Sequence, residues 1–161
     1  GGTGHARTVL QKYSGASRWT FLRDLVARSP GKIVFGSGDI WTVDDIFLMI
    51  QYTGVHAVSV ARGCIGNPWI FRQARDMLQG LEPTPPTIAQ QRAVLDRHFQ
   101  LLLRVNMGAK DAEDLSSRQI RKFGVRFSAH HPQREEVRRA VIAVHDLKTW
   151  QEVLERYYSA S

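Results

Sequence analysis

A short segment rich in proline limits what this chain can fold into, because no regular helix can run through it. Residues 80–86 read GLEPTPP, with three prolines and one glycine. We predict a boundary there between a first domain, residues 1–80, and a second domain, residues 81–161. The 161 residues in total are enough to bury a substantial core.

The first half alternates helix-like and strand-like segments. Apolar residues at helical spacing, or capping patterns, mark helices at residues 17–28 and 42–54 and from about Asn67 onward. Short apolar or β-branched runs mark strands at residues 32–35 and 55–60. A repeated order of strand, glycine-containing loop and helix is typical of a parallel sheet covered by helices. The first half is therefore predicted to be α/β.

The second half contains helix-like segments and no convincing strand. Capping boxes at residues 87–90 and 149–152 predict the start of a long first helix and of a last helix that runs through Tyr157. Apolar spacing predicts a second helix around residues 118–127 and a third after Pro132. We predict a small helical bundle, so the fold class is α/β followed by all-α.

The chain carries an excess of positive charge that is concentrated in one stretch. It has 22 Lys and Arg against 15 Asp and Glu, a net charge of +7, which favours a polyanion such as a nucleic acid as partner. Within residues 116–139, Arg118, Lys122 and Arg126 share one face of a predicted helix. A solvated helix face without a partner is the alternative interpretation.

Two loops of the first half have the composition of a ligand site. Residues 36–39 (Gly-Ser-Gly-Asp) and residues 61–63 (Ala-Arg-Gly) each follow a predicted strand. In parallel α/β proteins, ligands bind at the carboxyl ends of the strands. The first loop suits the polar edge of a cofactor, and the arginine of the second suits a phosphate. Tight connections without a ligand are the alternative.

The cysteine content and the lengths of the apolar runs bear on the cellular context of the chain. The single cysteine, Cys64, forms no intrachain disulfide, and we assign it no catalytic role. One cysteine gives no sign of an oxidising compartment, so we expect a cytoplasmic protein. No apolar run approaches the length of a membrane span, so we expect no membrane-spanning segment. His130 and His131 are expected to be turn residues, and we expect no metal site. The sequence does not begin with Met, so we expect a trimmed chain.

Several phrases of the sequence resemble the tRNA-dihydrouridine synthases in order and spacing. The most specific of them runs from Arg62 to Phe71, and a basic pair stands at Arg121-Lys122. The other phrases are His5-Ala6-Arg7-Thr8, Tyr13-Ser14-Gly15 with Trp19, and Gly38-Asp39-Ile40.

The resemblance implies a flavin enzyme that reduces uridine to dihydrouridine in tRNA with NADPH. It also implies that residues 1–80 are the last strands of a (β/α)8 TIM barrel that binds FMN, and that residues 81–161 are the helical domain that binds tRNA. The implied cofactor-binding residues are His5, Ser37, Gly38, Asp39, Ala61, Arg62 and Gly63. The implied nucleic-acid-binding residues are Arg7, Arg118, Arg121, Lys122 and Arg126. The catalytic cysteine of such enzymes is expected in the barrel portion before this chain.

Two further interpretations remain open at this point. The chain can act as a tRNA-binding module without catalysis, or as a half-barrel fragment that associates with itself and has no activity. A complete barrel takes about 250 residues, and an incomplete one leaves an unpaired strand edge and exposed apolar residues. We therefore predict a homodimer.

Overall fold

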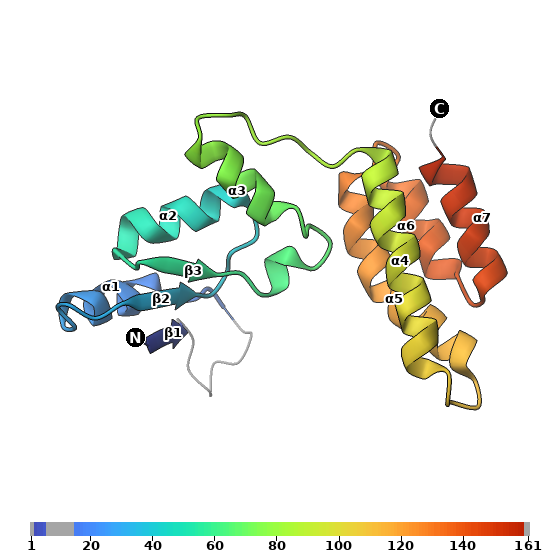
Figure 1. The fold of residues 1–161 in the computed structure, drawn as a ribbon, viewed down its shortest axis with the longest axis horizontal. Helices are drawn as coiled ribbons and strands as arrows, with labels where there is room; N and C mark the ends of the chain where they lie inside the picture. The colour runs from blue at the N-terminus through green and yellow to red at the C-terminus, as the bar shows by residue number, and fades with distance from the viewer. Residues whose placement is uncertain (1, 6–14, 160–161) are drawn as a thin grey trace. The chain divides into compact units, whose positions relative to one another are not determined.

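The computed structural model describes residues 2–5 and 15–159, and the chain divides into two compact units (Figure 1). Unit 1 contains the chain up to Cys64 and residues 68–83, and unit 2 contains residues 65–67 and the chain from Thr84 onward. The passage from Pro83 to Thr84 lies within the proline-rich segment. Residues 65–67 also belong to unit 2, although they come before the proline-rich segment, and the sequence does not predict this assignment.

Unit 1 is built on a parallel sheet of three short strands. The strands are β1 (Gly2–His5), β2 (Val34–Ser37) and β3 (Ala57–Ser59), in the order β1-β2-β3. Their last residues are in register, with His5 opposite Ser37 and Ser37 opposite Ser59. The predicted α/β class with a parallel sheet is confirmed, and the carboxyl ends of all three strands meet at one edge.

The strand bounds differ from those expected. Residues 32–35 were the predicted strand, yet Lys32 donates its backbone N–H to Ser29 in the turn that follows the first helix. The strand therefore starts at Val34 and takes in Gly36 and Ser37, so the loop begins only at Gly38. Strand β3 is shorter than the predicted 55–60, and β1 was not predicted.

Helices α1 (Trp19–Ala27) and α2 (Val43–Thr53) cover one face of this sheet. Gly4 and Gly36, paired across β1 and β2, have no room for a side chain: a Cβ would lie 2.8 Å from Leu22 in α1 and 2.7 Å from Met49 in α2. The alternate residues point the other way, and Phe35 among them is 41% exposed. Within the part of the chain that the structure describes, the sheet thus has one face covered by helices and one open face.

The ends of the helices follow largely from local sequence. Helix α2 has the predicted capping box, in which Thr42 and Asp45 bond each other's backbone N–H, and Gly54 ends it with a left-handed φ of 71°. A one-turn helix, η1 (Arg62–Cys64), follows β3, and α3 (Ile70–Leu78) begins after the Asn67-Pro68 turn. Phe71, in the first turn of α3, is 50% exposed.

Unit 2 is helical throughout the part that the structure describes. Its elements are α4 (Ile88–Asn106), α5 (Ala112–Phe127), η2 (Ser128–His130), α6 (Arg134–Ala143) and α7 (Leu147–Tyr158). The core includes Leu95, Ile120 and Tyr158, and Phe99 stacks on Trp150 with ring centroids 5.5 Å apart. The predicted capping box of α4, Thr87 with Gln90, is present. Among the described residues, no helix has the length and apolar character needed to cross a membrane.

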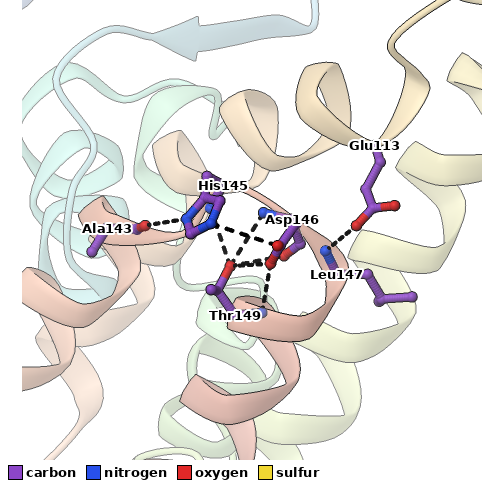
Figure 2. Close-up of polar contacts among 6 residues, drawn as sticks. All are labelled: Glu113, Ala143, His145, Asp146, Leu147 and Thr149. Atoms are coloured by element: carbon purple, nitrogen blue, oxygen red, sulfur yellow. Dashed lines mark hydrogen bonds and ion pairs between the residues drawn. The ribbon is translucent and has the colours of Figure 1, made fainter.

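The last helix starts earlier than the sequence suggests. Thr149 was predicted to be its N-cap, but the cap is Asp146, whose carboxylate accepts from the Thr149 backbone N–H at 2.7 Å (Figure 2). Glu113 of α5 accepts from the N–H of Leu147 at 2.6 Å. Hydrogen bonds from Thr149 hold the pKa of Asp146 below its usual value. The cap at Asp146 and the carboxylate of Glu113 together let α7 begin earlier in the chain than predicted.

His131 lies in the bend between η2 and α6, where a turn was predicted, and its side chain is buried. Its Nδ1 accepts from the backbone N–H of Gln133 at 3.0 Å, so its proton belongs on Nε2, which donates to the carbonyl of Tyr157 at 2.6 Å. The ring therefore ties the start of α6 to the end of α7.

Candidate functional site

A small cavity lies at the carboxyl edge of the sheet in unit 1, and we call it the loop cavity. Its volume is about 120 Å³, somewhat below the roughly 150 Å³ of a cavity that holds one benzene molecule. Ser37 and Ser59 reach it from the open face of the sheet, at the ends of β2 and β3. The full lining is Ser37, Gly38, Asp39, Ile40, Trp41, Ser59, Ala61 and Arg62.

One arginine supplies the positive charge of the loop cavity. The guanidinium of Arg62 lies 3.3 Å from the carboxylate of Asp39 and 4.9 Å from the ring centroid of Trp41. About a third of the Arg62 side chain is exposed, so this ion pair is accessible to a competing anion. The aromatic face and the carboxylate fix the direction of the guanidinium.

The loop after β2 is held in a conformation that few residues adopt. Gly38 has φ 124° and Asp39 has φ 51°, and positive φ favours glycine, asparagine and aspartate. The approach to α1 secures the loop: the N–H of Ser17 donates to Asp39 Oδ2 at 2.7 Å, and Trp19 Nε1 donates to the Gly38 carbonyl at 3.0 Å. The loop backbone is thus placed before any ligand binds.

The loop after β3 packs directly on the loop after β2. A Cβ on Gly63 would lie 2.0 Å from the carbonyl oxygen of Ile40, so only glycine permits this approach. The contact brings Arg62 beside Asp39 although the two residues are far apart in the sequence.

The structure brings together five of the seven residues expected to bind a cofactor. These five, Ser37, Gly38, Asp39, Ala61 and Arg62, all line the loop cavity. Gly63 lies beside it, where it permits the loop contact. His5 is placed by its backbone at the end of β1 opposite Ser37. Arg7 lies outside the described residues.

Sequence reasoning missed Trp41 and Ser59, which also line the loop cavity. Two signals could have found them. Ser59 follows Ala57 by two residues, so period-two alternation puts both on one face of β3. Trp41 stands two residues after Asp39, in the same connection to α2.

The loop cavity has the chemistry of an anion site. It offers a guanidinium, backbone beside small side chains, and two serine hydroxyls, and it admits an object the size of a phosphate group with a few neighbouring atoms. A whole flavin exceeds its volume. The donor set therefore fits the phosphate end of a ligand whose remainder lies outside the cavity.

A second, larger depression lies on unit 2, and we call it the basic hollow. Its volume is about 670 Å³, and it is formed by one face of α5 and the end of α6. Four predicted nucleic-acid-binding residues lie together there, with two apolar side chains that were not predicted. The lining residues are Arg118, Arg121, Lys122, Val125, Arg126 and Ile142.

Comparison with known proteins identifies the family. The family model described as "Dihydrouridine synthase (Dus)" matches residues 3–160. A probable tRNA-dihydrouridine synthase of Mycobacterium tuberculosis is 35% identical over 150 residues, which cover 92% of this chain and 36% of the relative. Similarly named proteins of Treponema pallidum (38% over 128 residues, 77% and 36%) and Rickettsia conorii (30% over 159 residues, 98% and 46%) also match.

The chain therefore spans between about a third and a half of the length of these relatives. Within that span, the match runs from the start of the sheet to the end of α7. Because the family model covers nearly all of the chain, and relatives at 30% identity or more cover most of it, the chain belongs to the dihydrouridine synthase family.

Proposed function

We propose that this chain forms the flavin-phosphate site and the tRNA-binding helices of an enzyme that reduces uridine to dihydrouridine in tRNA. The observation that carries the proposal is the loop cavity, in which Arg62 and the Gly38 loop meet at the carboxyl edge of a parallel sheet. Family membership supports the reaction class. Unit 1 would then be the last part of a (β/α)8 barrel, and its open face would be the barrel interior.

Each group of the loop cavity has a part in holding the cofactor. Arg62 binds the phosphate of FMN, while Ser37, Gly38 and Asp39 contact the phosphate and the ribityl chain. Ala61 and Gly63 keep the second loop close enough for those contacts, and His5, at the end of β1, contacts the flavin. A flavin held there would supply hydride-transfer chemistry, passing reducing equivalents from NADPH to the uracil ring, and a proton would complete the reduction.

The basic side chains of unit 2 bind the phosphates of tRNA in this proposal. Arg118, Arg121, Lys122 and Arg126 lie around one hollow, and clustered cations are what a nucleic-acid backbone requires. Arg7 is proposed to contact the substrate uridine or its phosphate. The interpretation as a module without catalysis is not favoured, since the matched relatives are named for the synthase.

A comparison of FMN with riboflavin tests the loop cavity. The two ligands share the flavin ring and differ in the phosphate, so a phosphate site predicts that the full chain binds FMN more tightly. Replacing Arg62 by Met removes one charge-assisted contact, and we expect FMN affinity to fall about 10- to 150-fold. Riboflavin affinity should stay unchanged. Flavin fluorescence titration measures both.

Arg23→Met is the matched control, because Arg23 lies on α1 beside Asp24 and Tyr52 and away from the loop cavity. It should leave FMN affinity unchanged. Equal affinity of the unaltered chain for FMN and riboflavin, or no binding of either, would overturn the assignment of the cavity.

A further inference from the structure

Helices α5 and α6, which line the basic hollow, pack against each other at a glycine. Gly124 of α5 faces Val141 of α6, and a Cβ on Gly124 would lie 2.7 Å from a Val141 methyl group. The next residue, Ile142, is thereby brought beside α5, where Arg121 donates to its carbonyl oxygen at 3.4 Å. The helix packing therefore fixes the backbone positions from which the lining side chains project.

The rim of the hollow carries more positive charge than its own carboxylates balance. Arg118 pairs with Asp114 one turn earlier, at 3.0 Å. Among the described residues, neither Lys122 nor Arg126 forms a salt bridge, and both side chains are exposed. An anionic partner can therefore pair with Lys122 and Arg126 without first breaking a salt bridge between either of them and a carboxylate.

The floor of the hollow is apolar, which phosphate binding alone does not explain. Val125 and Ile142 form it, and Ile142 is 46% exposed in the midst of the cations. A phosphate seated on these side chains would lose hydration and gain no hydrogen bond from them. A group with an apolar face and an attached anion suits the combination better.

We propose that the basic hollow receives one unstacked nucleobase of the bound RNA, with the flanking phosphates on its rim. The face of the base packs on Val125 and Ile142, and the guanidinium plane of Arg121, anchored near Ile142, is available for stacking. Lys122 and Arg126 bind the phosphates on either side. This inference rests on the proposed tRNA function and deepens it, since it requires a loop or bulge and not a continuous duplex at unit 2.

Two RNAs of equal phosphate number test this inference: a hairpin with an unpaired loop and a blunt duplex. We expect the full chain to bind the hairpin about fivefold or more tightly than the duplex. Ile142→Ser should abolish that preference while duplex affinity and salt dependence stay unchanged. Lys122→Gln should weaken binding of both RNAs and reduce the salt slope by about 1. Val105→Ser, at an 80% exposed position of α4, is the matched control.

The outcomes separate this inference from the proposed function. A hairpin whose loop nucleotides lack bases should bind like the duplex. If Ile142→Ser binds the intact hairpin as well as the unaltered chain does, the base site is wrong, while phosphate binding stands. If neither RNA binds the unaltered chain, both the base site and the tRNA function are wrong.

Discussion

Gly63 is the residue on which the geometry of the loop cavity depends most directly. A methyl group there would lie 2.0 Å from the backbone oxygen of Ile40, so one loop must move away from the other. We expect Gly63→Ala to lower the free energy of unfolding by about 1–3 kcal/mol and to weaken FMN binding, because Arg62 moves with the loop. Urea unfolding and flavin titration measure the two effects.

Gly108→Ala provides the control for that substitution, since nothing lies within 4 Å of the added Cβ. It should change neither stability nor FMN affinity appreciably. A Gly63→Ala chain that binds FMN as tightly as the unaltered chain would contradict the role given to the loop contact.

His98 makes the stability of unit 2 depend on pH. Burial lowers its pKa below 6.5, and its ring lies edge-on to Phe123 with centroids 4.3 Å apart; burial likewise lowers the pKa of His130. The unfolded chain binds these protons more readily, so the free energy of unfolding should fall as pH drops below about 6.5. Urea unfolding between pH 7 and pH 5 tests this.

His98→Gln should make the decline in stability shallower over the same range. The lowered carboxyl pKa values of Asp146 and Glu155 lie below the ordinary values of 3.8 and 4.5, so those groups remain charged there. A decline of unchanged steepness in His98→Gln would show that His98 does not cause it.

At the scale of helices and strands, sequence predicts what is local. The capping boxes that begin α2 and α4 each involve residues three positions apart, and both are present. Strand β1, with two glycines in four residues, has no strand pattern of its own and forms because β2 offers it a parallel partner. Helix α7 begins with a local capping box as well, Asp146 with Thr149, and Glu113, 34 residues earlier, adds one bond to the N–H of Leu147.

Gly124 controls the approach of α5 to α6, and the contact can be tested by substitution. Gly124→Ala adds a helix-favouring residue but places its Cβ 2.7 Å from a methyl group of the stiff Val141 side chain. We expect a net loss of about 1–2 kcal/mol in the free energy of unfolding.

The double substitution Gly124→Ala with Val141→Ala should cost less than the sum of the two single ones, because the smaller residue makes room for the added methyl group. Urea unfolding of the four chains gives the coupling. Additive effects would show that these two side chains do not compete for the same space.

At the scale of the whole molecule, the order of strands and loops along the chain predicts where a ligand site lies. It does not predict which other residues line that site. Parallel strands with glycine loops place both candidate loops at one edge, and the loops of β2 and β3 do meet there. The apolar floor of the basic hollow was not predicted. Ile142 has no functional pattern in the sequence, and the packing of α6 on α5, at Gly124 and Val141 among other residues, brings it to the same hollow as Val125.

The open face of the sheet gives the last prediction, which concerns association of this chain. Phe35 is 41% exposed on that face, and among the described residues β1 and β3 each pair on one side only. Unpaired edges and exposed apolar faces favour pairing with another chain. Light scattering after size exclusion should therefore give about twice 18.3 kDa. Phe35→Asp should lower this mass to that of a single chain. Leu78 is exposed on α3, and Leu78→Asp, as the control, should leave the dimer mass unchanged. A single-chain mass for the unaltered protein at high concentration would refute the dimer.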